Sequence, residues 1–454
     1  MFKKIEIWIL YLVVLLGIPI TVGFGYLVKY EIFGGTRFGM ISKSALFLAE
    51  MPSNLKRILS GESVDLTVED KFPLLDAFDG IPNSSESYLI LTRYDGDIKE
   101  GIVELVDLTT FEVIHTWNPD IDKFNKLVPS NYEFKSLMRD GNNSRFVPRH
   151  PILLEDGGLV FHRETPLRKI DKCSNLVFQN SHDNFHHSIE LDADGNIWVP
   201  SYMYPQTLPI DKVGRKFIPD GGYQDDGIVK ISPEGKILFE KSVSQIFIDN
   251  GLEYLLFSVG DSQFMKDPIH LNDIQPVLTN GNFWQKGDVF LSLRHQSMVL
   301  LYRPSTNKII WKGKGPFFHQ HDVDILNDYS ISVFNNNSKN FVDGDIVDGH
   351  NEVIIYDFIR NEYSSYLNES LIKNDVRTNT EGLSEVLPNG DLFLEETNSG
   401  RLLYIDADGT IRWSYVNRAE NGKVYVVSWA RILYDKKDIK IVNNFLQSDV
   451  NCVN

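Results

Sequence analysis

The sequence predicts an all-β fold, a six-bladed β-propeller, preceded by one N-terminal transmembrane helix. Three observations support this prediction: a long apolar run near the N-terminus, hairpin signals that recur along most of the chain, and a length of 454 residues that suits one large closed β domain. We expect a membrane anchor at residues 1–29, a stalk at 30–75 with a short helix at 42–51, and the β-propeller domain at 76–454.

The N-terminal segment is interpreted as an uncleaved membrane anchor. Residues 7–28 contain no charged side chain, and a helix of this length crosses the hydrocarbon core of a bilayer. No small-residue cleavage site, as at the end of a signal peptide, follows the run. Lys3 and Lys4 favour a cytoplasmic N-terminus and an extracytoplasmic main domain, although Lys29 weakens the contrast. A buried core helix is the alternative, but the run shows no polar face.

After the stalk, two kinds of hairpin alternate along the chain. One kind has Asp-Gly or Asn-Gly between alternating apolar residues, as in 187–199 and 384–394, and the other ends in an aromatic residue, as in 298–311 and 401–413. Two hairpins make a four-stranded unit, the repeat of a propeller, with a sandwich or β-helix as the alternative. Residues 424–434 are left over and would pair with the first unit to close the ring. Six units begin near residues 82, 150, 186, 270, 321 and 383.

Composition excludes several classes of function. The net charge of −17 repels phosphate backbones, so we expect no nucleic-acid partner. Cys173 and Cys452 form neither a disulfide scaffold nor a metal motif; they are either one long-range bridge in an oxidising compartment or, more simply, two free thiols. The sequence contains no Gly-rich phosphate loop and no Ser–His–Asp elbow, and we expect no cofactor.

Histidines recur at the start of successive units. His150, His187, His270 and His321 each stand at the start of the first strand of a unit, and first strands line the central channel of a propeller. These imidazoles would therefore converge at one end of the axis. Each residue also has a structural alternative, for example a turn residue at His150 or a hydrogen-bonded core histidine at His270.

Neighbouring histidines leave a choice of which side chain faces the channel. Successive residues of a strand point to opposite faces, so only one of His186 and His187 would face it, and His187 is favoured. His319 and His321 share a face, and His321 fits the repeat better.

Arg294 belongs to the same expected neighbourhood, because it ends a strand of the unit that starts at His270. Arginine offers a planar fork of donors, so arginine and histidines together suit an anion with three exposed oxygens, such as sulfate or phosphate. His295 is expected to point away from the side of Arg294, and Arg294 could instead simply pair with an acid. A metal site using Asp273 or Asp322 is the competing interpretation, but the nearby cationic arginine argues against it, and we expect no metal.

Four segments resemble signature segments of the bacterial, nucleotide-independent arylsulfotransferases, a family of six-bladed propellers. They are residues 185–196, 270–273, 292–297 and 320–326, in the family's order, and the resemblance runs from about residue 145 to 433. The family transfers a sulfuryl group from a phenolic sulfate ester to another phenol through a sulfated histidine, which predicts ping-pong kinetics.

The resemblance also implies roles for individual residues. By motif position His321 would be the nucleophile, and His187, His270 and Arg294 would bind the sulfuryl oxygens, with one histidine protonating the leaving phenolate. Residues implied in substrate binding are His150, His186, Asn272, His295 and His319. Partners would be an aryl sulfate donor, a phenolic acceptor and the membrane; the oligomeric state stays open.

The chain departs from the best-known branch of that family in three ways. The N-terminal β-sandwich is replaced by anchor and stalk, the cysteine pair near the nucleophile is missing, and the motif around His270 lacks a tryptophan before the histidine and a serine after Asn272. The acceptor pocket would therefore differ. A non-catalytic propeller that binds a sulfated or anionic ligand is the alternative function, and a scaffold that uses its acidic rim is a third.

Overall fold

The computed structural model describes most of the chain, in two compact units. One unit comprises Met1–Asp65 with Pro209–Tyr223, and the other comprises Leu66–Leu208 with Gln224–Asn454. The described residues are 6–32, 38–59, 66–128, 141–203, 205–208, 223–257, 265–341, 344–447 and 452. Lys3 and Lys4, which carry the prediction of orientation, lie outside them.

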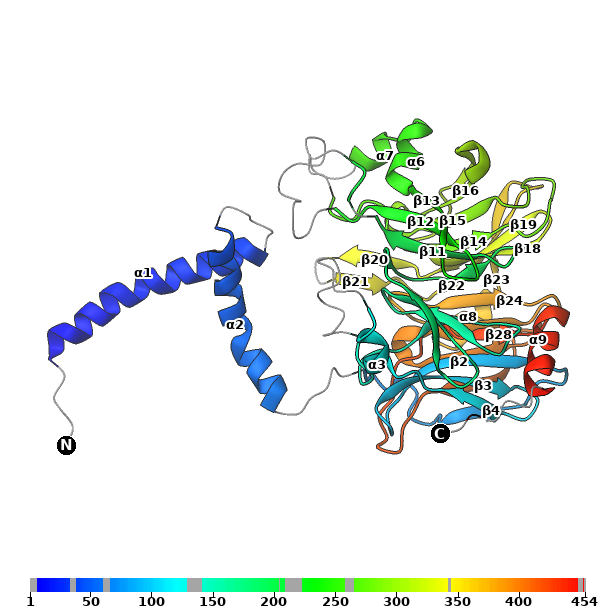
Figure 1. Cartoon of the computed structure of the whole chain (residues 1–454), viewed down its shortest axis with the longest axis horizontal. Helices are drawn as coiled ribbons and strands as arrows, with labels where there is room; N and C mark the ends of the chain where they lie inside the picture. Colours follow the sequence, from blue (N-terminus) through cyan, green and yellow to red (C-terminus); the bar gives the residue numbers. More distant parts are fainter. Residues whose placement is uncertain are drawn as a thin grey trace. The chain divides into compact units, whose positions relative to one another are not determined.

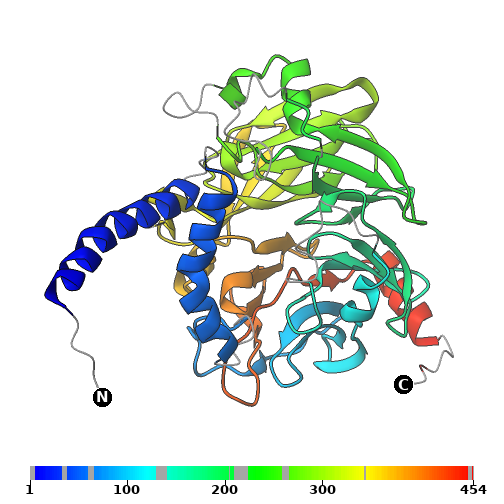
Figure 2. The ribbon, with the colours of Figure 1, turned by 60° about the vertical axis from the view of Figure 1, so that its left-hand side comes forward.

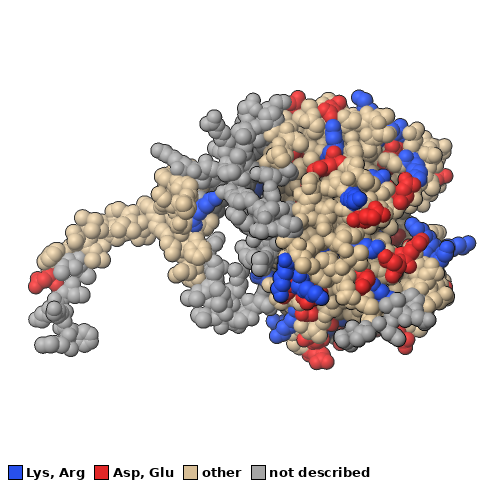
Figure 3. Space-filling view, in the orientation of Figure 1, with Lys and Arg blue, Asp and Glu red and all other residues tan. Residues whose placement is uncertain are grey.

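The described residues of the first unit form two helices, α1 (Ile7–Ile32) and α2 (Met40–Leu59). Within α1, the segment Tyr11–Tyr30 is long and apolar enough to cross a membrane, with Lys29 in its last turn. Figure 3 shows mostly uncharged side chains along this helix. The predicted N-terminal helix of membrane-spanning length is therefore present. The stalk helix is longer than the expected 42–51, because α2 continues through Pro52.

The second unit is the predicted six-bladed β-propeller, built from six antiparallel sheets (Figures 1 and 2). Each blade is described from its innermost strand outward. Blade 1 consists of β28 (Arg431–Leu433), β2 (Tyr88–Asp95), β3 (Glu100–Asp107) and β4 (Glu112–Trp117). Blade 2 consists of β5 (Arg149–Leu153), β6 (Leu159–His162), β7 (Leu167–Ile170) and β8 (Leu176–Asn180). Blade 3 consists of β9 (Asn184–Phe185) and β10 (Glu190–Leu191), which both pair with β11 (Ile197–Tyr202), then β12 (Asp226–Ile231) and β13 (Ile237–Ser242).

The remaining blades follow the same order. Blade 4 consists of β14 (Leu271–Pro276), β15 (Val289–Leu293), β16 (Met298–Arg303) and β17 (Lys308–Gly313). Blade 5 consists of β18 (His321–Asn327), β19 (Ser330–Asn335), β22 (Glu352–Asp357) and β23 (Glu362–Tyr366). Blade 6 consists of β24 (Leu383–Val386), β25 (Leu392–Glu396), β26 (Arg401–Ile405), β27 (Ile411–Val416) and β1 (Ala77–Gly80). A hairpin, β20 (Ser338–Phe341) and β21 (Gly344–Val347), is inserted in blade 5.

Short helices complete the second unit. They lie mostly in connections between strands, and the last of them follows β28 and buries an apolar face against blades 1 and 2. They are α3 (Ile121–Asn125), α6 (Val243–Asp249), α7 (Tyr254–Phe257), α8 (Asn368–Lys373), α9 (Lys436–Gln447) and the 3-10 turns η2 (Arg294–Gln296), η3 (Pro304–Thr306) and η4 (Thr397–Ser399).

The two ends of the propeller chain close the ring. The predicted pairing of residues 424–434 with the first unit is confirmed, because β28 pairs with β2 and becomes the innermost strand of blade 1. A second closure was not predicted: β1 pairs with β27 as the fifth strand of blade 6. The short sequence of β1 has little apolar alternation, so its pairing depends on the neighbouring strand rather than on its own pattern.

Buried carboxyl groups connect neighbouring blades near the axis. Each accepts a backbone N–H from the start of the next blade, and this contact sets the spacing of the innermost strands. The pairs are Asp226 with His270, Asp273 with Val323, Asp322 with Ser384, and Glu395 with Trp429 and Ala430, at 2.6 to 3.0 Å. Burial raises the pKa of Asp273 to about 7 and that of Asp322 well above its usual value. These contacts give Asp273 and Asp322 a structural role in place of the metal-ligand role considered from sequence.

A disulfide joins Cys173 to Cys452. It connects the turn between β7 and β8 with the chain beyond α9, across a sequence separation of 279 residues. The simpler expectation of two free thiols is therefore wrong. The sequence left this open because two cysteines so far apart can be placed within bonding distance only by the fold.

Removing the bridge is expected to lower the thermal stability of the propeller. A double variant, Cys173→Ala with Cys452→Ala, should lose about 2–4 kcal/mol, because a cross-link between distant residues restricts the unfolded chain. Thermal denaturation followed by circular dichroism measures the change in midpoint. Reductant should lower the midpoint of the wild-type protein and leave that of the double variant unchanged; equal midpoints without reductant would contradict the prediction.

Candidate active site

Three of the predicted histidines lie together near the propeller axis. The ring of His187 in blade 3 has its centroid 5.3 Å from that of His270 and 6.1 Å from that of His321. The ring centroid of Trp429, just before β28, lies 6.2 Å from that of His187 and 6.3 Å from that of His321. Arg294 completes this group, which we call the histidine–arginine cluster: His187, His270, Arg294 and His321.

Several residues at or just before the innermost strands adopt left-handed backbone conformations. The φ angles are positive at His150, His187, His270, His319 and Trp429, with values between 46° and 61°. Such values are uncommon for residues other than glycine and store strain that the surrounding structure must offset. Because these residues leave the extended conformation, the alternation of side chains along a strand does not apply to them.

His186 and His187 show the consequence. The prediction that only one of them would face the channel assumed an extended strand, but the innermost strand is interrupted between β9 and β10. Nδ1 of His186 therefore lies 2.8 Å from Nδ1 of His187. His186 also stacks on Tyr202, with ring centroids 4.1 Å apart, and its Nε2 lies 3.6 Å from Oδ1 of Asp226. His186 is therefore packed between His187, Tyr202 and Asp226.

The side chain of Asn336 determines the tautomer of His321. Nδ1 of His321 is 2.7 Å from Oδ1 of Asn336, while the amide nitrogen of Asn336 donates to the backbone oxygens of Thr378 and Glu381. Since Oδ1 of Asn336 can only accept, Nδ1 of His321 carries the proton and Nε2 carries the lone pair. Burial, and then the charge of Arg294, lower the pKa of His321 well below its usual value. The imidazole is therefore neutral at pH 7.

Arg294 begins the turn η2, directly after β15. Its Nη2 donates to Oδ2 of Asp345 at 2.6 Å, and its Nη1 lies 2.8 Å from Nε2 of His295. The prediction that His295 points away from Arg294 is wrong, because the two residues lie in a 3-10 turn rather than in an extended strand. Nε of Arg294 is buried without a hydrogen-bond partner among the described residues, which leaves a donor for an anion.

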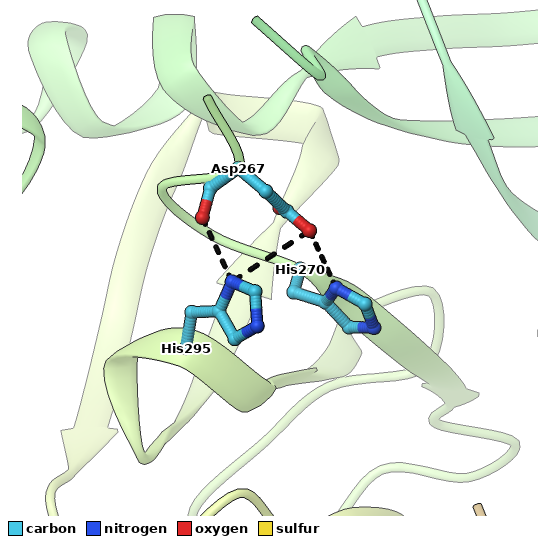
Figure 4. Close-up of side chains that lie close together, drawn as sticks. All are labelled: Asp267, His270 and His295. Carbon is cyan, nitrogen blue, oxygen red and sulfur yellow. Dashed lines mark hydrogen bonds and ion pairs between the residues drawn. The ribbon is translucent and has the colours of Figure 1, made fainter. Parts of the chain in front are cut away.

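Asp267 orients two imidazoles of the site (Figure 4). Its Oδ2 is 2.6 Å from Nδ1 of His270, and its backbone oxygen is 2.8 Å from Nδ1 of His295. Burial alone would raise the pKa of Asp267, but the hydrogen bond from His270 and the nearby imidazoles hold it below its usual value. Asp267 is therefore an ionised acceptor that takes the Nδ1–H of His270, so Nε2 is the nitrogen of this ring that remains for a substrate.

Asp267, His270 and His295 also have the geometry of a metal site, with one ligand atom of each within 4.8 Å of the others. The surrounding charges do not suit a cation, because Nη1 of Arg294 already lies 2.8 Å from Nε2 of His295. Repulsion between the guanidinium and a metal ion would be strong at this distance. The three residues fit a hydrogen-bonded network better than a metal centre.

His319 lies on the Asp345 side of the site. Its Nδ1 is 3.9 Å from Oδ1 of Asp345, and its ring centroid is 5.8 Å from that of His295. Burial, followed by the charge of Arg294, lowers the pKa of His319 to about 4. His319 and His321 thus contact different partners, Asp345 and Asn336, although they are two residues apart.

His150 and Asn272 make contacts between blades in the structure. Nε2 of His150 is 2.8 Å from Nη2 of Arg431, and the ring lines a separate cavity of about 130 Å³. The amide nitrogen of Asn272 donates to the backbone oxygen of Gln320 at 2.7 Å, which connects blade 4 with blade 5. The contacts that the structure describes for these two side chains therefore join neighbouring blades.

Several residues of the site were not predicted. Asn336 stands in a run of three asparagines after β19, and Asp267 precedes Pro268 just before His270, but both patterns are common in turns. The inserted hairpin of β20 and β21 supplies Asp345. The unpredicted residues are Arg149, Asp267, Asn336, Asp345, Glu381 and Trp429.

The fold and the site together define a β-propeller protein with a buried cluster of imidazoles and one guanidinium. The family model described as arylsulfotransferase (ASST) matches residues 150–418, which include every member of the histidine–arginine cluster. The chain belongs to the arylsulfotransferase family, as the resemblance predicted. Membership implies aryl sulfate sulfotransferase activity, with an aryl sulfate and a phenol as substrates.

Other comparisons add no functional information. No curated protein matches the chain. A protein of unknown function from Bacteroides caccae is 13% identical, with 76% of this chain and 98% of that chain covered and a TM-score of 0.44. The Pan2 WD40 domain of Neurospora crassa is 10% identical, with coverages of 73% and 75% and a TM-score of 0.36. The WD40 β-propeller domain of Doa1 is 11% identical, with coverages of 83% and 96% and a TM-score of 0.39.

Proposed function

We propose that the protein transfers the sulfuryl group of an aryl sulfate ester to a phenol through a sulfated His321. The observation that carries the proposal is the state of His321: a buried, neutral imidazole whose lone pair is held on Nε2 by Asn336. A neutral imidazole is a competent nucleophile near pH 7. Two half-reactions follow, and they predict ping-pong kinetics.

In the first half-reaction Nε2 of His321 attacks the sulfur atom. A nitrogen–sulfur bond forms, the sulfur–oxygen ester bond breaks, and its electron pair leaves with the phenolate. A proton on Nε2 of His270 passes to the phenolate oxygen, while Asp267 holds the Nδ1–H of the same ring. In the second half-reaction His270 takes the proton of the acceptor phenol, whose oxygen attacks the sulfur and releases His321.

Charge on the sulfuryl oxygens is held by preorganised donors. Nε of Arg294 is a buried donor without a partner among the described residues, and His187 lies beside both His270 and His321. Donors fixed before the reaction stabilise the transition state without reorganisation. Asp345 holds the guanidinium in place from its other side.

We further propose that the propeller lies in the periplasm, or otherwise outside the cytoplasm, and is anchored by α1. Disulfides persist mainly in oxidising compartments, and the bridge between Cys173 and Cys452 supports this location. The helix of membrane-spanning length supports the anchor.

A non-catalytic anion binder is the second candidate function. One observation favours it: the backbone N–H of Glu381 lies 3.3 Å from Nε2 of His321, where it competes for the lone pair. A long hydrogen bond of this kind is weak, and an entering sulfate must displace it.

The direct test is turnover of an aryl sulfate by the purified full-length protein. We expect a phenolic acceptor to sustain release of the donor phenol, and the donor alone to leave one sulfated peptide that contains His321, detected by mass spectrometry. Affinity for the aryl sulfate without phenol release or sulfated peptide would support the anion binder. The absence of both affinity and turnover would contradict both functions.

Substitution of Asn336 tests whether this residue fixes the tautomer of His321. Asn336→Ala is expected to lower kcat by between about 10²- and 10⁴-fold with a smaller change in KM, because the lone pair is then no longer confined to Nε2. Asn336→Asp places a carboxylate at Nδ1, which should raise the pKa of His321 and move the acidic limb of the kcat profile to higher pH. Identical pH profiles for the wild type and Asn336→Asp would contradict this role.

A further inference from the structure

A second group of metal-binding side chains lies outside the histidine–arginine cluster. His182 and Asp183 stand in the connection between β8 and β9, and Glu240 lies in β13 of blade 3. Nε2 of His182 is 4.0 Å from Oδ1 of Asp183 and 3.9 Å from Oε2 of Glu240. One ligand atom of each residue lies within 4.8 Å of the other two.

Asp183 is buried, and one of its carboxyl oxygens has no partner. The residue is 4% exposed, and Oδ2 has no hydrogen-bond partner among the described residues. A buried carboxylate oxygen without a partner costs free energy unless a cation or a proton compensates it. In the part of the chain that the structure describes, neither carboxyl group pairs with a lysine or an arginine.

We propose that His182, Asp183 and Glu240 bind a divalent transition-metal ion of the zinc class. One imidazole and two carboxylates form a ligand set for a borderline ion such as Zn²⁺, whereas Mg²⁺ and Ca²⁺ prefer oxygen ligands alone. Ligand atoms of a tetrahedral zinc site lie roughly 3.4 Å apart. The side chain of His182 is 62% exposed, so its ring can move toward the two carboxylates. Water completes the coordination.

The position of this site indicates a structural role. A bound ion connects the segment before β9 with the outer strand β13, and β9 leads directly to His186 and His187. Thr165, in blade 2, already donates to the backbone oxygen of Asp183 and holds the segment from the other side. The metal therefore stabilises the junction of blades 2 and 3, independently of the proposed sulfuryl transfer.

Calorimetric titration of the chelator-treated, full-length protein with ZnCl2 tests the proposal. We expect Zn²⁺ to bind at this site and raise the midpoint of thermal denaturation, while Mg²⁺ and Ca²⁺ do not. His182→Ala, whose side chain is exposed, and Glu240→Gln should each weaken zinc binding by about tenfold or more. Asp194→Asn, an exposed carboxylate paired with Lys286, is the matched control and should bind zinc as the wild type does.

A second variant separates this site from the group around Asp267. His295→Ala removes a ligand of that group and should leave the zinc stoichiometry and the stabilisation unchanged. Zinc binding that survives His182→Ala but disappears in His295→Ala would overturn the proposal. So would the absence of any zinc binding by the wild type at micromolar concentrations.

Discussion

Replacement of His321 with alanine is expected to lower kcat for sulfuryl transfer by about 10⁴-fold or more, the scale seen when a covalent nucleophile is removed. No other described side chain combines a neutral ring, a lone pair directed by Asn336 and contact with His187. The sulfated peptide should disappear together with the turnover. Stopped assays of phenol release and intact-mass spectrometry measure the two effects.

Two controls show that the loss comes from chemistry rather than from unfolding. His350→Ala removes another partly buried histidine, whose Nε2 is bonded to Asn368 away from the site, and should leave kcat unchanged. Imidazole added to His321→Ala should restore part of the phenol release, because the small molecule can occupy the vacated position and accept the sulfuryl group. Normal turnover by His321→Ala would assign the nucleophile to another residue.

Replacement of Arg294 with alanine is expected to lower kcat/KM by about 10²- to 10³-fold, as for the loss of an oxyanion donor. The variant loses the guanidinium and also leaves the carboxylate of Asp345 without its partner at 2.6 Å. The unpaired negative charge then repels the sulfate. Arg294→Lys should retain more activity than Arg294→Ala, because it keeps the charge but not the planar fork of donors.

A double variant separates these two contributions. Arg294→Ala combined with Asp345→Asn removes the repulsion, and it should recover part of the activity that Arg294→Ala loses. Steady-state kinetics on one aryl sulfate donor measures kcat and KM for each variant. Equal kcat/KM for the wild type and Arg294→Ala would contradict a role of the guanidinium in binding the sulfuryl oxygens.

The strands of the propeller were largely predictable, because their signals are local. Asp-Gly at 194–195 and Asn-Gly at 389–390 lie between short apolar strands, and both form the expected turns. The apolar run at 424–434 also indicated the closing strand β28. The pairing of β1 with β27 was missed, since four residues without clear alternation carry no register of their own.

The sequence predicted the members of the histidine–arginine cluster, but not the hydrogen bonds around them. Alternation along a strand predicted that His295 points away from Arg294, and this prediction was wrong; it also gave no sign of the contact between His186 and His187. In both places the backbone leaves the extended conformation, through a positive φ or a 3-10 turn. Strained backbone at functional positions overrides the simple period of two.

By itself the sequence determined the repeated hairpins and the apolar run at 7–28, and it proposed the imidazoles and the guanidinium of the site, because these depend on short windows or on motif residues. Only the tertiary structure decided which nitrogen of His321 carries the proton, because Asn336 takes its orientation from Glu381. The same holds for the partner of Arg294, which lies 51 residues away in an inserted hairpin, and for the disulfide, which spans 279 residues. Such contacts are set by the closure of the ring, which no local pattern encodes.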